Sequence, residues 1–79
     1  MNKLQSSLQD VFLNFARKEK VEITIYLVNG VPIKGNVLSF DTFTILLNVD
    51  KKQNLIYKHA ISTLAPTRPI PYKNEENSQ

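Results

Sequence analysis

Three consecutive residues near the end of the chain carry the groups most able to do chemistry. Tyr57, Lys58 and His59 place a phenol, an ammonium and an imidazole side by side within the segment IYKHAIST, and His59 is the only histidine. This group could serve as a catalytic base, a metal ligand, a nucleic-acid contact or an ordinary exposed surface. The remainder of the sequence has to decide among these four interpretations.

Catalysis and metal binding find little support in the sequence. The chain has no cysteine, and a single histidine cannot form a zinc site within one chain. Asp41 and either Ser39 or Ser62 could complete a triad with the histidine on paper, but no nucleophile elbow and no glycine-rich phosphate loop accompany them. We therefore predict a binding protein and not an enzyme, with no cofactor, no metal and no small-molecule substrate.

Aromatic and basic residues at strand ends and corners favour single-stranded nucleic acid, which proteins hold by stacking bases on rings and neutralising phosphates with cations. Tyr26 precedes a turn, Phe43 follows the corner SFDT, and Tyr57 adjoins the basic pair. Alternation does not decide whether Phe40 or Phe43 points outward, and a phenylalanine near a tight corner is usually a core residue. Tyr26 shares its strand face with two polar residues, so we expect it to be exposed.

Length and charge narrow the class further. The 79 residues suffice for one small domain near the lower limit of independent stability, and oligomerisation is the expected remedy in a chain without disulfides. The net charge is +3, and residues 1–65 carry the whole excess, as expected either of a polyanion-binding surface or of ordinary solubilising charge. No apolar run is long enough to span a membrane and no signal peptide is apparent, so we expect a cytoplasmic protein without membrane attachment.

The first segment is expected to form an amphipathic helix. Ser6 and Gln9 fit a capping box, and the basic run 17–20 suits the negative C-terminal end of the helix dipole. That basic run has two explanations of equal weight, a solvated last turn or a set of phosphate contacts. The apolar stripe with helical spacing consists of Leu8, Val11, Phe12 and Phe15.

A period of 2 replaces the helical period at residue 21 and predicts strands. Asn29-Gly30 predicts a type I′ hairpin turn with positive φ at both residues, and Gly35 predicts a bend or bulge. One helix followed by five short strands predicts an α+β, mostly β, domain with a small, strongly bent antiparallel barrel over residues 1–66, followed by a short disordered tail at 67–79. The expected strands span residues 21–28, 31–40, 43–49, 55–58 and 61–65.

Four stretches in order, SLQDVFLNFARKEK, IYLVNG, SFDTFTILL and IYKHAIST, resemble the signature segments of the Hfq family of bacterial Sm-like RNA chaperones over about residues 6–66. The order of YKHAIST after SFD-F and NG is specific, whereas NG alone carries little weight. The resemblance implies an Sm-like (SH3-type) five-stranded barrel with an N-terminal helix. It also implies a homohexameric ring, closed by pairing the fourth strand of one subunit with the fifth strand of the next. Copies of Lys58 and His59 would then converge near the ring axis, where an anionic ligand such as RNA offsets their repulsion.

The resemblance further implies three RNA-binding surfaces and a role in post-transcriptional regulation, through pairing of small regulatory RNAs with messengers. The proximal face would take uridine-rich ends of small RNAs through Gln9, Asp41, Thr42, Phe43, Tyr57, Lys58 and His59. The distal face would take adenine-rich RNA through Tyr26, Asn29, Gly30, Val31, Pro32, Ile33, Asn54 and Thr63. The outer rim would contact RNA bodies and assist annealing through Asn14, Arg17, Lys18 and Lys20.

Several residues depart from the family pattern. Thr42 replaces a longer polar residue, which is expected to weaken one uridine contact, and lysines follow Arg17 at the rim where many members carry arginine. Lysine lacks the planar fork of arginine, so less annealing is expected from this rim. Pro32 and Asn54 lie where the adenine-binding modes of the family differ, and the sequence does not assign the adenine motif.

Two alternatives stay open: a ring that acts as a protein-interaction scaffold without RNA, and a monomeric SH3- or OB-like RNA binder.

Overall fold

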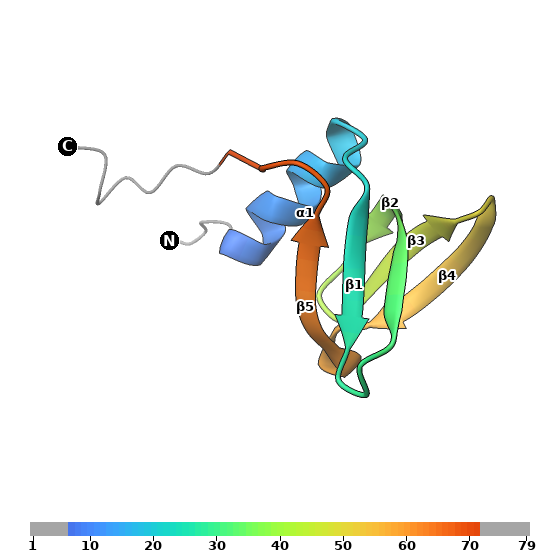
Figure 1. The fold of residues 1–79 in the computed structure, drawn as a ribbon. Helices are drawn as coiled ribbons and strands as arrows, with labels where there is room; N and C mark the ends of the chain where they lie inside the picture. The colour runs from blue at the N-terminus through green and yellow to red at the C-terminus, as the bar shows by residue number, and fades with distance from the viewer. Residues whose placement is uncertain (1–6, 72–79) are drawn as a thin grey trace.

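The computed structural model describes residues 7–71, in which one α-helix is followed by five antiparallel strands (Figure 1). This confirms the predicted α+β, mostly β, fold with an N-terminal helix. A short 3-10 turn, η1, fills the gap predicted between the last two strands. The elements are α1 (Leu8–Lys18), β1 (Ile23–Leu27), β2 (Pro32–Phe40), β3 (Thr44–Val49), β4 (Lys52–Tyr57), η1 (Lys58–Ala60) and β5 (Ile61–Pro66).

The ends of α1 are set by local hydrogen bonds. Ser7 is the N-cap, and its hydroxyl accepts a hydrogen bond from the backbone N–H of Asp10 at 3.1 Å. The predicted capping box at Ser6 and Gln9 is therefore wrong by one residue, and Ser6 itself lies outside the described residues. At the other end, Lys20 takes a left-handed conformation with φ 55°, and the N–H of Val21 bonds back to the helix at 3.0 Å, as in a Schellman motif.

The buried face of α1 differs from the predicted stripe. Leu13 and Ala16 are fully buried, and Phe12 and Phe15 are half-buried against the core. Leu8, by contrast, leaves 66% of its surface exposed, and Val11 is also exposed. The helix is thus rotated toward Leu13 and Ala16, because its contacts are made with a bent sheet and not with a flat surface. Periodicity identified an apolar side but placed its centre incorrectly.

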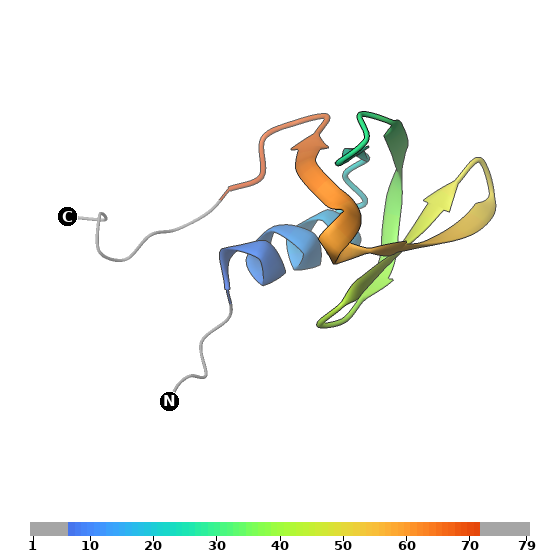
Figure 2. The same cartoon turned by 90° about the horizontal axis from the view of Figure 1, so that it is seen from below.

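The strands form one sheet in the order β4-β3-β2-β1-β5, with every neighbouring pair antiparallel. The long strand β2 pairs with β1 up to Gly35 and with β3 from Asn36 onward, so the sheet bends at this point, as predicted for Gly35. Figure 2 shows the hairpin of β3 and β4 extending away from α1. β4 and β5 are the two edges of the sheet and do not pair with each other, so the barrel is not closed within the chain.

The core lies between α1 and the two halves of the bent sheet. It is built from aliphatic side chains with less than a tenth of their surface exposed, and the inward positions alternate along β1 and β3 as a period of 2 requires. No polar or charged side chain among the described residues is buried with them. The members are Leu13, Ala16, Val21, Ile23, Ile25, Val37, Ile45, Leu47 and Ile56.

Two consecutive residues with positive φ occur in the β3–β4 turn, and not in the β1–β2 turn where the sequence predicted them. In the β1–β2 turn Gly30 has a φ of +91°, but Asn29 does not adopt positive φ, and its side chain instead accepts a hydrogen bond from the N–H of Val31 at 3.0 Å. The predicted type I′ turn at Asn29-Gly30 is therefore wrong. Positive φ at two consecutive residues occurs at Asp50 and Lys51, which join β3 to β4. Because this turn needs only two residues, β4 begins at Lys52, earlier than expected.

The chain stays in contact with the domain beyond β5. The N–H and the hydroxyl of Thr67 both donate to the carbonyl of Glu22, at 2.9 and 3.0 Å, and the Arg68 guanidinium donates to the carbonyl of Glu19 at 3.4 Å. Ile70 is half-buried against the core. The first residues of the predicted tail 67–79 thus contact the domain, and residues 72–79 lie outside the described range.

Candidate nucleic-acid interface

A single carboxylate organises the loop between β2 and β3. One oxygen of Asp41 accepts three hydrogen bonds: from the N–H of Phe43 at 2.9 Å, from the N–H of Thr44 at 2.7 Å and from the Thr44 hydroxyl at 2.8 Å. The backbone N–H of Asp41 also donates to the Thr44 carbonyl at 2.9 Å. With its backbone held in this way, Phe43 leaves 73% of its surface exposed to solvent. The sequence left open whether Phe40 or Phe43 points outward, and the structure selects Phe43.

The charge of Asp41 is favoured by the same contacts. The hydrogen bond from the Thr44 hydroxyl lowers the pKa of the Asp41 carboxyl below its ordinary value, as do the two backbone N–H groups and, to a smaller extent, the nearby Lys58 ammonium. The carboxylate is exposed to solvent. The main contacts of Asp41 are therefore structural: its carboxylate holds the loop in the conformation that leaves the Phe43 ring exposed.

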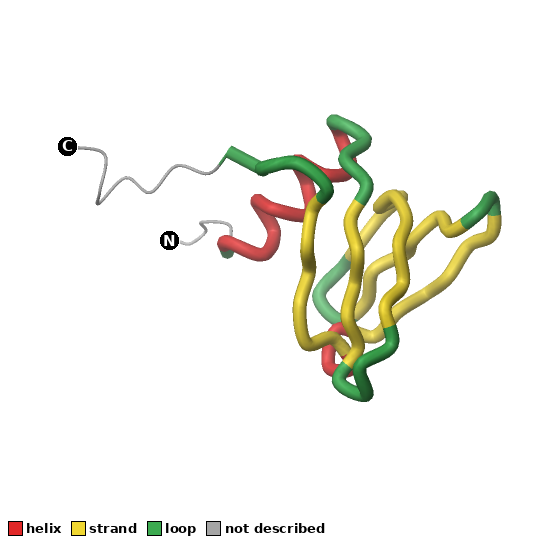
Figure 3. The backbone as a smooth tube through the Cα atoms, in the orientation of Figure 1, coloured by secondary structure: helices red, strands yellow, loops and turns green. Residues whose placement is uncertain are grey.

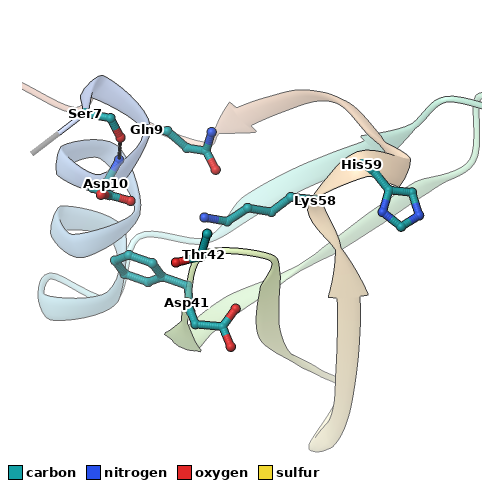
Figure 4. A pocket seen from close by; sticks show the side chains of 8 residues that line it. Ser7, Gln9, Asp10, Asp41, Thr42, Lys58 and His59 are labelled. Carbon is teal, nitrogen blue, oxygen red and sulfur yellow. Dashed lines mark hydrogen bonds between the residues drawn. The ribbon is translucent and has the colours of Figure 1, made fainter.

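The η1 turn lies directly beside this loop. The N–H of Lys58 donates to the carbonyl of Phe43 at 2.8 Å, which joins the two segments. The Lys58 ammonium lies 5.8 Å from the centre of the Phe40 ring, within the range of a cation–π contact. On the other side of the turn, the rings of Tyr57 and His59 are stacked with centroids 5.7 Å apart and planes 26° from parallel. Figure 4 shows the Lys58 side chain reaching toward α1, with its ammonium between Gln9 and Thr42, while the His59 ring lies apart.

These residues surround a groove of about 640 Å³, which we call the proximal groove. It brings together five of the seven residues predicted for the proximal face, whereas Phe43 and Tyr57 are exposed but do not line it. Sequence reasoning missed Phe40, which it treated as a core candidate, and the helix N-terminal residues Ser7 and Asp10; the position of Ser7 before the apolar helix was the available signal. The lining residues are Ser7, Gln9, Asp10, Phe40, Asp41, Thr42, Lys58 and His59.

Most residues predicted for the distal face lie together at another place on the sheet. Tyr26 is the partner of Pro32 on β2 and of Thr63 on β5, and partners across antiparallel strands share a face. Tyr26 leaves 40% of its surface exposed, which agrees with the expectation from its polar neighbours. Asn54 is separate, because it lies on β4 with β3 and β2 between it and β1.

The turn that carries Lys58 and His59 also contacts the β1–β2 loop, which holds Asn29, Gly30 and Val31 of the predicted distal face. The N–H of Val28 donates to the carbonyl of Ala60 at 2.8 Å, and Figure 3 shows η1 next to that loop. Gly30 and Val31 are exposed in this loop, and Ile33, on β2, is half-buried. The basic turn and the loop are therefore neighbours within one chain.

The predicted rim residues separate into two groups on α1. Asn14 and Lys18 line one groove together with Phe15 and Phe40. Arg17 and Lys20 line a different groove on the other side of the helix end, although the Arg17 guanidinium donates to the Asn14 side chain at 2.6 Å. The predicted rim residues thus line two grooves, and the Arg17–Asn14 hydrogen bond connects them.

The whole arrangement, an N-terminal helix, a five-stranded bent sheet and the basic η1 turn, can be compared with known proteins. The family model described as Hfq protein matches residues 8–71. This chain belongs to the Hfq family. The "RNA-binding protein Hfq" of Leptospira biflexa is 60% identical over 72 residues, which cover 91% of this chain and 87% of the relative. The protein of the same name from Clostridium beijerinckii is 58% identical over 76 residues, covering 96% and 94% of the two chains.

The fold agrees with this family assignment. A solved structure described as the crystal structure of the pleiotropic translational regulator Hfq matches with a TM-score of 0.73 and 39% identity, covering 75% of this chain and 98% of that chain. The Sm-like fold predicted from the four sequence stretches is confirmed. Over residues 7–71, no three metal-binding side chains gather to form a cluster. None of the helices in that range is long and apolar enough to cross a membrane.

Proposed function

We propose that this Hfq-family chain is an RNA-binding protein that takes uridine-rich ends of small RNAs at the proximal groove and adenine-rich RNA around Tyr26. Through these two sites it would promote pairing of small RNAs with messengers in the cytoplasm, without enzymatic chemistry of its own. The observation that carries the proposal is the exposed Phe43 ring, presented by the Asp41 hydrogen bonds on a loop whose Phe43 carbonyl accepts the backbone N–H of Lys58 in the basic turn. An exposed ring on a loop joined to a basic turn offers a surface for base stacking and positive charge for a phosphate, the two contacts by which proteins hold single-stranded RNA.

The relatives support the RNA-binding part of this proposal. Proteins 60% and 58% identical to this chain are named RNA-binding proteins. In the proximal groove, the Gln9 amide can hydrogen-bond a base, while Lys58 supplies positive charge for a phosphate. Thr42 offers only a short hydroxyl there, so we expect the uridine contacts to rest mainly on Phe43 and Gln9.

We also propose that six copies close into a ring through the two edges of the sheet. β4 exposes Leu55 and Tyr57 at one edge, and β5 forms the other edge. An apolar groove of about 490 Å³ lies beside β5, lined by Leu8, Ile61 and Leu64 among others, and the side chains of a neighbour's β4 would fill it. Ring closure would cover both edges and bring the copies of Lys58 together, where bound phosphate offsets their repulsion.

Two oligonucleotides test the two-site proposal. Fluorescence anisotropy with labelled oligo(U) and oligo(A) should show that each binds in the presence of saturating amounts of the other. Phe43→Ala and Lys58→Ala should weaken oligo(U) selectively, and Tyr26→Ala should weaken oligo(A) selectively, by about fivefold or more for a lost stacking contact. Full competition between the two ligands, with equal effects of all three substitutions, would contradict the two-site proposal.

Native mass spectrometry tests the ring and separates the alternatives. A species of six chain masses that gains mass with oligo(U) supports the proposal. A species of one chain mass that binds RNA would identify a monomeric RNA binder. A six-chain species that binds neither oligonucleotide at low salt would leave only a scaffold role.

A further inference from the structure

A second groove, of about 510 Å³, lies between the C-terminal end of α1 and the outer side of β2 and β3. We call it the lateral groove. It shares no lining residue with the proximal groove, and only two of its residues were predicted for the rim. Its lining consists of Arg17, Lys20, Asn36, Val37, Leu38 and Asn48.

A β-bulge turns an apolar side chain toward this groove. Val37 pairs with Leu47 and Ser39 pairs with Leu46, so Leu38 has no partner on β3. Bulges of this kind redirect the side chain of the extra residue. Leu38 is 41% exposed, which gives a largely polar groove one apolar wall.

Two carboxamides face the groove next to that wall. Asn36 on β2 and Asn48 on β3 are direct cross-strand partners, so their side chains project from the same face of the sheet. The amide nitrogen of Asn36 lies 3.4 Å from the Lys20 carbonyl, a long hydrogen bond that leaves its oxygen available as an acceptor. Each carboxamide offers a donor and an acceptor in one plane, which is the pattern that reads base edges.

The charges of the groove favour an anion. Arg17 and Lys20 are exposed cations on its helix side, and no carboxylate lines it. The left-handed conformation of Lys20, set by the helix-ending motif, places its backbone against Asn36. The cations, the carboxamides and the apolar wall therefore meet in one groove.

We propose that the lateral groove binds one unpaired adenine nucleotide of an RNA strand. Its base would contact Leu38 and hydrogen-bond Asn36 or Asn48 through the N6 and N7 edge, which carboxamides match, and its phosphates would lie by Arg17 and Lys20. The proposal rests on the RNA-binding function proposed above and extends it. The rim of this chain then selects a base in addition to attracting phosphate.

The test uses the full chain with Tyr26→Ala and Phe43→Ala combined, which removes the stacking residue of each proposed face. Anisotropy with short oligo(A) and oligo(U) should show that this background still binds oligo(A) and prefers it. Adding Asn48→Leu, which keeps size and charge, should lower oligo(A) affinity by about tenfold and abolish the preference. Leu38→Ala should lower it by about threefold through the lost apolar contact.

Lys18→Ala is the matched control, because Lys18 lies on the other rim groove and its removal should weaken both oligonucleotides equally. Circular dichroism and thermal unfolding confirm that each variant is folded. A photoreactive 8-azidoadenosine oligonucleotide provides a measurement that needs no further substitution: its label should be found on residues 35–51, and Asn48→Leu should remove it.

The outcomes separate this proposal from the proposed function. Equal affinities for the two oligonucleotides, unchanged by Asn48→Leu and Leu38→Ala, would show that the groove contacts phosphate only and would overturn base selection. If the chain with Tyr26→Ala and Phe43→Ala binds no RNA while the parent chain does, the lateral groove is not an RNA site, and the proposed function is unaffected. A parent chain that binds neither oligonucleotide would refute the proposed function itself. A last outcome is that polyglutamate prevents labelling of residues 35–51 when unlabelled oligo(A) does not. That result would show that the groove binds an acidic protein segment and not adenine.

Discussion

Replacing Gly35 by alanine should disrupt the bend of the sheet. β2 changes partner from β1 to β3 at this residue, and the backbone of β3 passes close to its Cα. An added methyl group would overlap the Asn48 carbonyl oxygen and would lie 3.0 Å from both the Asn48 carbonyl carbon and Val49 Cγ2. Because the overlapping atom belongs to the backbone, no side-chain rotation can relieve it, and β3 itself must move.

The expected cost is about 3 kcal/mol, at the upper end of the usual range for overpacked sites. For a domain of this size the whole free energy of unfolding is about 4–12 kcal/mol. A loss of 3 kcal/mol corresponds to a fall in Tm of about 12–24 °C. The displacement of β3 would also move Asn48 and so disturb the lateral groove.

Gly30→Ala is the matched control, because it adds the same methyl group at the other glycine. Nothing lies within 4 Å of that position, but its φ of +91° is unfavourable for alanine. We expect a cost of about 1 kcal/mol from this conformation alone. Thermal unfolding followed by circular dichroism, at one fixed protein concentration because assembly affects Tm, compares the two variants. If Gly35→Ala were no more destabilising than Gly30→Ala, the reasoning from close backbone approach would be refuted.

Three further predictions concern local contacts. Lys20→Gly should raise stability by about 0.5–1 kcal/mol in denaturant unfolding, because glycine relieves the left-handed conformation at the helix end; a loss of stability would contradict this. Ser7→Ala should cost about 1 kcal/mol in the same assay by removing the N-cap, and Ser7→Thr should restore most of it; equal stability of all three chains would show that the cap contributes nothing. The folded-state pKa of Asp41 lies below its ordinary 3.8, so its contribution to stability is complete above that pH and is lost as the pH falls through the folded pKa. Asp41→Asn should therefore flatten the fall of Tm with acid below pH 3.8, and an unchanged acid profile would contradict the assignment.

The elements of the fold could largely be predicted from sequence, because the signals for them are local. The change of period from helical to alternating located α1 and the strands, and the inward residues of β1 are those that alternation selects. Where the prediction was wrong, either tertiary packing or a competing local hydrogen bond decided the outcome. Leu8 is exposed because the bent sheet contacts the Leu13 side of the helix, and Asn29 avoids positive φ because its side chain bonds Val31 instead.

The amino-acid sequence by itself determined the order of helix and strands, the cationic body and, through its four signature stretches, the family to which the chain belongs. Only the tertiary structure decided which side chains share a groove. It brought Gln9 of the helix to Lys58 of the last turn, and it placed Arg17 and Lys18, neighbours in sequence, in the linings of different grooves. The physical reason is that periodicity reports whether a residue faces the core or the solvent, whereas the bend at Gly35 and the docking of α1 decide which outward faces become adjacent.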